Sequence, residues 1–170
     1  MNDIVNFEEY IQTFECNSLQ YARGDLLQMA RDGKFDIVVQ GCNCFKTMKS
    51  GIAKQIAKEH PGAVDADNET EFGDYNKLGN YTISNENYQF HIVNAYTQFD
   101  VSKGGDVFEY DAFKLILNKL AYKFPLARFG FPLIGMGLAR GKPAIIVEML
   151  CEFSTKIEKF GGTVTIVEFN

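Results

Sequence analysis

The sequence predicts an α/β protein: a three-layer α/β/α sandwich with a central mixed sheet. Segments with strand character alternate with segments of helical periodicity along most of the chain. Several strand segments, such as residues 35–40, lack polar alternation, which is typical of strands buried on both faces of a sheet. The chain has 170 residues, of which 46% are hydrophobic and 23% charged, so we expect one domain over residues 1–170.

The first predicted unit is a strand at residues 19–23 followed by a helix. Asp25 suits the N-cap of that helix, because a carboxylate accepts hydrogen bonds from the free N–H groups of the first turn. Gly33 is a natural helix stop. The residues alone therefore assign Asp25 a capping role.

The second predicted unit is a strand at residues 35–40, a loop at 42–50 and a helix at 51–59 that Pro61 closes. Such a junction places backbone N–H groups and a helix N-terminus beside a strand end, which suits an anion. Asn43 stands where the strand becomes the loop and offers both donors and an acceptor to a polar ligand.

Residues 64–80 are polar and acidic and predict an exposed connection. By composition alone, Lys77 within it is a solvated surface lysine. The strands predicted at 81–84 and 88–95 form a hairpin. His91 alternates within the second strand, which favours a core or interface position over a catalytic one.

The C-terminal part predicts a helix through residues 108–120, a strand at 129–134, a helix at 143–160 and a strand at 163–169. The sequence GMGLARGKP follows the first of these strands and resembles a second phosphate cradle. Its glycines allow close approach of a ligand to the backbone: Gly135, Gly137 and Gly141.

Charge and composition exclude several classes of protein. The formal net charge is −5 and Lys and Arg form no block, which argues against extended contact with nucleic acid but not against a small anion. No apolar run is long enough for a membrane span, and we expect a cytoplasmic protein without a cofactor. The cysteines lack the spacing of a zinc site, so we expect no metal and reduced, structural thiols at Cys16, Cys42, Cys44 and Cys151.

Five segments, in this order, resemble the macrodomain family of ADP-ribose binders. The resemblance covers residues 24–169 and is closest to the branch that includes ADP-ribose-1″-phosphate processing proteins and lysine-dependent ADP-ribosyl-glutamate hydrolases. Its motifs are GDLL at 24–27, VVQGCN at 38–43, SGIAKQI at 50–56, VNAYTQ at 93–98 and PLIGMGLARG at 132–141.

The resemblance implies binding roles for residues of four of these motifs and for Phe169. Asp25, beside Leu26, would accept a hydrogen bond from the adenine amine, Phe169 would lie against the adenine ring, and Asn43 would meet the distal ribose. Two loops would surround the diphosphate with backbone N–H groups: Ser50, Gly51 and Ile52 in the first, and Gly135, Met136, Gly137 and Leu138 in the second.

The resemblance also implies a reaction. We expect hydrolysis of the terminal phosphate of ADP-ribose-1″-phosphate, with Asn43, Lys77 and His91 as candidate catalytic residues. One alternative is a non-catalytic reader or scavenger of ADP-ribose, favoured by Ala139 and Lys142, which stand where related hydrolases carry carboxylates. Another is removal of ADP-ribose from an ADP-ribosylated protein through Lys77.

Overall fold

The computed structural model describes residue 4 and residues 6–48, 51–100 and 107–170. Within these ranges no helix is long and apolar enough to span a membrane. The helices are α1 (Phe7–Gln12), α2 (Leu26–Arg31), α3 (Gly51–Glu59), α4 (Pro61–Asn68), the 3₁₀ turn η1 (Tyr75–Lys77), α5 (Tyr110–Lys123) and α6 (Pro143–Phe160). The strands are β1 (Leu19–Gly24), β2 (Ile37–Cys42), β3 (Tyr81–Glu86), β4 (Phe90–Tyr96), β5 (Arg128–Phe131) and β6 (Thr163–Phe169).

The strands form one mixed sheet in the order β1-β6-β5-β2-β4-β3. All neighbours are parallel except β3, which pairs antiparallel with β4. The predicted hairpin is therefore confirmed, and its turn uses positive φ angles at Asn87 and Tyr88, which match the twist of the two strands. Five strands consequently point their carboxyl ends toward the same edge of the sheet.

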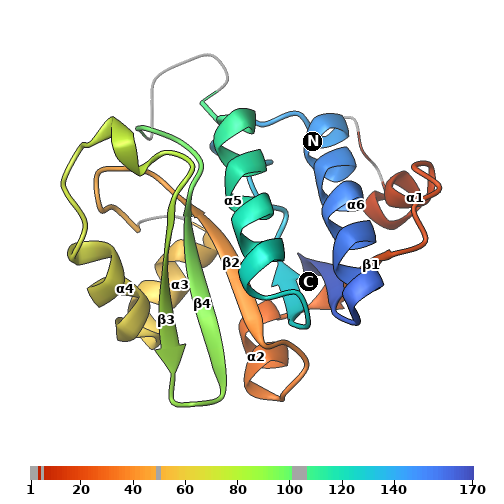
Figure 1. Cartoon of the computed structure of the whole chain (residues 1–170), viewed down its shortest axis with the longest axis horizontal. Coiled ribbons are helices and arrows are strands. Elements are labelled where there is room, and N and C mark those ends of the chain that lie inside the picture. Colours follow the sequence, from red (N-terminus) through yellow and green to blue (C-terminus); the bar gives the residue numbers. More distant parts are fainter. Residues whose placement is uncertain (1–3, 5, 49–50, 101–106) are drawn as a thin grey trace.

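Helices cover both faces of the sheet, which confirms the predicted three-layer α/β/α architecture (Figure 1). Alternate residues of each strand enter different cores, because side chains point to opposite faces. Val39 packs in the core under α1, α5 and α6, whereas its neighbour Val38 packs with residues of α2, α3 and α4. Both valines are fully buried, as the absence of polar alternation in this strand predicts.

Part of the acidic segment expected as an exposed connection is a helix. Helix α3 ends at Glu59, before Pro61, as predicted, but Pro61 also begins α4, where no helical hydrogen bond needs its missing N–H. Ala63 and Asp67 are buried, so α4 belongs to the second helical layer. Composition hides this helix because its exposed face is polar and acidic.

Helix α1 lies before residue 19, where the local pattern predicts no element. Asn6 caps this helix by accepting a hydrogen bond from the backbone N–H of Glu9 at 3.1 Å. Phe7 and Ile11, one turn apart, bury their side chains in the core beside α6. One turn of apolar spacing is too short a pattern to predict a helix.

Strand β5 ends at Phe131, three residues before the expected end. Pro132 follows and cannot donate to a neighbouring strand. Residues 132–141 therefore form one continuous loop at the carboxyl edge of the sheet.

Candidate functional site

A pocket of about 940 Å³ lies at the carboxyl ends of the five parallel strands, a size within the usual range for small-molecule sites. The first residues beyond β1, β2 and β4 line it, together with the end of β6 and the loop after β5. Ligands in open α/β sheets collect outside such strand ends. The lining residues are Gly24, Asp25, Leu26, Gly41, Cys42, Asn43, Thr47, Gly51, Ile52, Ala53, Gln55, Thr97, Gln98, Pro132, Leu133, Ile134, Gly135, Gly137, Leu138, Ala139, Val167, Glu168 and Phe169.

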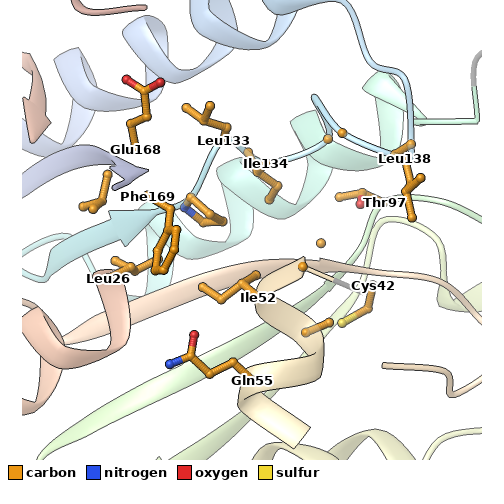
Figure 2. A pocket seen from close by; sticks show the side chains of 18 of the residues that line it. Leu26, Cys42, Ile52, Gln55, Thr97, Leu133, Ile134, Leu138, Glu168 and Phe169 are labelled. Atoms are coloured by element: carbon orange, nitrogen blue, oxygen red, sulfur yellow. The ribbon is translucent and has the colours of Figure 1, made fainter. Parts of the chain in front are cut away.

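The pocket is elongated, and its ends differ in character. Figure 2 shows Leu26, Glu168 and Phe169 at one end, and Cys42, Thr97 and Leu138 at the other. Ile52 and Ile134 lie between them. We call these the aromatic end and the polar end of the pocket.

Asp25 lies at the aromatic end and caps α2, as predicted. Its Oδ1 accepts the backbone N–H groups of Leu27 at 3.1 Å and Gln28 at 3.2 Å. Within the described residues Oδ2 accepts no hydrogen bond, so it is free to accept one from a ligand. Phe169 presents an exposed ring close to Leu26 (Figure 2).

Glu168 also lines the aromatic end, but neighbouring strand residues hold its carboxylate. Oε1 accepts a hydrogen bond from the hydroxyl of Tyr21 and lies 3.3 Å from Nη2 of Arg23. Burial and the neighbouring Glu168 carboxylate raise the pKa of Tyr21, which keeps this hydroxyl a donor.

Asn43 lies at the polar end and shapes the loop after β2. It is only 5% exposed. Its Nδ2 donates to the hydroxyl of Thr47 at 2.6 Å and to the carbonyl of Thr47 at 3.2 Å, and its Oδ1 accepts the N–H of Phe45 at 2.8 Å. The amide donors are therefore engaged within the loop, and the remaining capacity toward a ligand is one lone pair of Oδ1.

The N-terminus of α3 forms the floor of the pocket between its two ends. Gly51 and Ile52, both predicted site residues, line it, whereas Ser50 lies outside the described residues. The first-turn N–H groups of a helix have no acceptor within it and carry its positive dipole end. This part of the floor can therefore receive an anion.

The loop after β5 forms the opposite wall. Gly135 has a φ of +73°, and its carbonyl accepts the N–H of Gly141 at 2.6 Å, which closes the loop. Within the described residues the N–H groups of Gly137, Leu138 and Ala139 donate to no acceptor. Three adjacent free N–H groups at the pocket wall make a second anion-binding element.

Three predicted site residues do not line the pocket. Met136 turns into the core, where it packs among buried apolar residues. Lys77 is only 7% exposed. Its Nζ donates a hydrogen bond to the carbonyl of Cys44 at 3.0 Å and lies 4.9 Å from the ring centre of Tyr96. The ammonium group therefore stabilises the back of the β2 loop.

His91 lies at the amino end of β4, paired with Ile37 at the amino end of β2. Its Nδ1 is 3.2 Å from the carbonyl oxygen of Ser84. The pocket lies at the carboxyl end of the same strand. The length of β4 thus separates His91 from every lining residue.

Among the described residues, few groups around the pocket can move a proton. The titratable ones that line it are Asp25, Cys42 and Glu168. Burial raises the pKa of the Cys42 thiol, so it stays protonated near neutral pH. No Lys or Arg of the described ranges lines the pocket, so within them an anion would depend on backbone N–H groups.

Thr97 and Gln98, the last two residues of the motif at 93–98, line the pocket. Gln55 and Glu168 line it too, although neither is among the predicted site residues. Gln55 follows Ile52 at a spacing that puts both on one face of α3, a signal that could have identified it. Nothing in the local sequence pattern distinguishes Glu168 from any other polar residue near the end of a strand.

The chain matches no protein-family model. It is 36% identical over 148 residues to an uncharacterized 17.5 kDa protein from the tk-vs intergenic region of Enterobacteria phage T4, covering 82% of this chain and 92% of that one. Among solved structures, it resembles the macrodomain of Mycobacterium tuberculosis DarG, with a TM-score of 0.67, 19% identity, and coverage of 88% of this chain and 96% of that one. It also resembles Thermosipho africanus DarTG in complex with ADP-ribose, with a TM-score of 0.68, 15% identity, and coverage of 91% of this chain and 42% of that one.

Proposed function

Because this chain belongs to the family of the T4 17.5 kDa protein and has the macrodomain fold, we propose that its pocket binds ADP-ribose or a close derivative of it. The observation that carries the proposal is the order of chemical groups along the pocket. A free carboxylate oxygen and an aromatic ring lie at one end, and the N-terminus of α3 lies in the middle. At the other end, polar side chains lie beside the free N–H groups of the loop after β5.

Each part of ADP-ribose has a counterpart in this order. Asp25 Oδ2 would accept the adenine amine, and the ring of Phe169 would stack on the base. The diphosphate would lie between the N-terminus of α3 and the free N–H groups of the loop after β5. The distal ribose would then reach Asn43 and Thr97 at the polar end.

Isothermal titration calorimetry with ADP-ribose tests this proposal, with AMP as the matched control. AMP has the base and one phosphate but no distal ribose, so we expect it to bind at least about tenfold more weakly. Equal affinities for AMP and ADP-ribose would show that the polar end does not contribute to binding of the distal ribose. An absence of heat with ADP-ribose would overturn the proposal.

Binding without chemistry is the form of this function that the geometry supports best. Asp25 and Glu168 lie at the adenine end in the proposed orientation, far along the pocket from the ribose. The Lys77 ammonium is bonded to the Cys44 carbonyl outside the pocket, which disfavours removal of ADP-ribose from proteins through this lysine. A reader or scavenger needs no proton-moving group.

Hydrolysis of the terminal phosphate of ADP-ribose-1″-phosphate is the second candidate. Phosphoryl transfer depends mainly on positioning and electrostatic stabilisation, and free N–H groups line this pocket. Release of inorganic phosphate from ADP-ribose-1″-phosphate tests it. Phosphate release by the wild-type protein that is abolished in Gly137→Val would support this candidate. Tight binding of the compound without phosphate release would instead support the non-catalytic reader.

A further inference from the structure

Four aromatic side chains gather beside the polar end of the pocket. Phe45 packs edge-on against Phe72 at 5.1 Å and Phe99 at 4.9 Å, and Tyr75 stacks on Phe99 at 3.7 Å between ring centres. Phe72 is 68% exposed and Tyr75 is 67% exposed. We call Phe45, Phe72, Tyr75 and Phe99 the aromatic surface.

Backbone hydrogen bonds join the aromatic surface to the pocket wall through Cys44. The carbonyl of Cys44 accepts the N–H of Gly73 at 2.8 Å, and its N–H donates to the carbonyl of Phe99 at 2.9 Å. Asn43 and Gln98, the sequence neighbours of Cys44 and Phe99, line the pocket. The aromatic surface therefore borders the polar end of the pocket.

Acidic residues around the aromatic surface favour a positively charged partner. Glu69, Glu71 and Asp74 lie on the segment that carries Phe72 and Tyr75, with both glutamates exposed. Two described cations lie nearby: Lys46 donates its Nζ to the carbonyl of Asn68 at 2.9 Å, and the buried Lys77 donates to the carbonyl of Cys44 at 3.0 Å, which leaves the three carboxylates in excess. Exposed rings within acidic surroundings attract guanidinium groups and repel phosphates, so a nucleic acid does not fit.

We propose that the aromatic surface binds arginine side chains of a polypeptide whose ADP-ribose group occupies the pocket. This inference rests on the proposed function, because it places the distal ribose at the polar end. The guanidinium would stack on the exposed rings of Phe72 and Tyr75 while Glu71 and Asp74 supply negative charge. The partner of the site is then a basic ADP-ribosylated protein segment, in preference to the free nucleotide.

The test uses two synthetic peptides that carry ADP-ribose on one serine, one with arginine and one with glutamate at the flanking positions. We expect the arginine peptide to bind about fivefold or more tightly than the glutamate peptide. The F72A/Y75A double variant should lose that preference and keep the affinity for free ADP-ribose. Tyr122→Ala removes a still more exposed ring from α5, away from the pocket lining, and should change nothing.

Glu71→Lys is a second test that leaves the packing of the four rings intact, because Glu71 is exposed and has no described partner. It should reduce the preference for arginine without changing stability. If the wild-type protein binds the two peptides equally, the inference is overturned. Binding of free ADP-ribose would still support the proposed function in that case. If free ADP-ribose does not bind, the proposed function fails and this inference with it.

Discussion

The two loops that flank the middle of the pocket reach their shapes by different means. The loop after β2 depends on one buried amide, because Asn43 bonds to Thr47 and Phe45. The loop after β5 depends on missing side-chain volume, because a Cβ at Gly135 would lie 2.5 Å from the ring of Phe108. Substitutions in the first loop should therefore lower the free energy of unfolding in proportion to the hydrogen bonds lost. A side chain added at Gly135 in the second loop should disrupt the whole loop.

Gly135→Ala should have the largest effect. The added Cβ meets Phe108, and a residue other than glycine is strained at a φ of +73°. We expect a loss of about 2–5 kcal/mol in the free energy of unfolding, measured with urea, since overpacking costs about 1–3 kcal/mol and a left-handed backbone about 1–2 kcal/mol.

Gly137→Ala is the matched control in the same loop. A Cβ there meets no atom within 4 Å, so stability should change by less than about 1 kcal/mol. If the two alanine variants are equally stable, volume at Gly135 does not determine the shape of this loop.

Asn43→Ala should have the next largest effect. It leaves the N–H of Phe45 and the hydroxyl of Thr47, both half-buried, without their partner, which costs about 1–2 kcal/mol. ADP-ribose affinity should fall roughly tenfold as the loop loosens. Thr47→Val removes only one of these bonds and should cost about half as much; a larger loss for Thr47→Val would contradict the central place of Asn43.

Asp25 separates stability from binding. Asp25→Asn keeps an oxygen that can cap α2 but puts a donor amide where Oδ2 faces the pocket, so stability should hold while ADP-ribose affinity falls about tenfold. Asp25→Ala should lose the same affinity and also about 0.5–2 kcal/mol of stability, because the cap is gone. An unchanged affinity in Asp25→Asn would exclude adenine from this end of the pocket.

Asp36 and Arg128, at the amino ends of β2 and β5, should give the smallest effect. The hydrogen bond from Arg128 lowers the pKa of the Asp36 carboxyl below its ordinary 3.8. Its stabilisation is complete above the unfolded pKa and is lost as the pH falls through the folded pKa. Asp36→Asn should therefore cost less than about 1 kcal/mol at pH 7 and less again at pH 3, with ADP-ribose binding unchanged. Urea unfolding of both proteins at the two pH values measures this difference, and a cost that grows toward pH 3 would contradict it.

Local patterns predict most of the fold. Unbroken apolar strands such as the one containing Val38 identify the centre of the sheet, and Asp25 with Gly33 marks the limits of α2. Helix α4 escapes prediction because Pro61 is consistent with both the end of one helix and the start of another. Only the burial of Ala63 under the sheet decides between them.

The part of the site that sequence motifs mark is predictable, and the part chosen by residue type alone is not. Gly51 and Gly137 are recognisable by motif and line the pocket. His91 and Lys77 fit a catalytic role by residue type alone, yet strand direction carries His91 to the far edge of the sheet and the Cys44 carbonyl engages Lys77. Position along a strand and bonding across loops are tertiary properties that spacing does not encode.

The most direct test of this account is ¹⁵N–¹H NMR of the protein during titration with ADP-ribose. The account predicts the largest shifts at the backbone N–H groups of Gly51, Ile52, Gly137 and Leu138, which would donate to the diphosphate. The N–H of His91 should not move. Saturable binding with shifts that leave both loops untouched, or no shifts at millimolar ADP-ribose, would contradict the account.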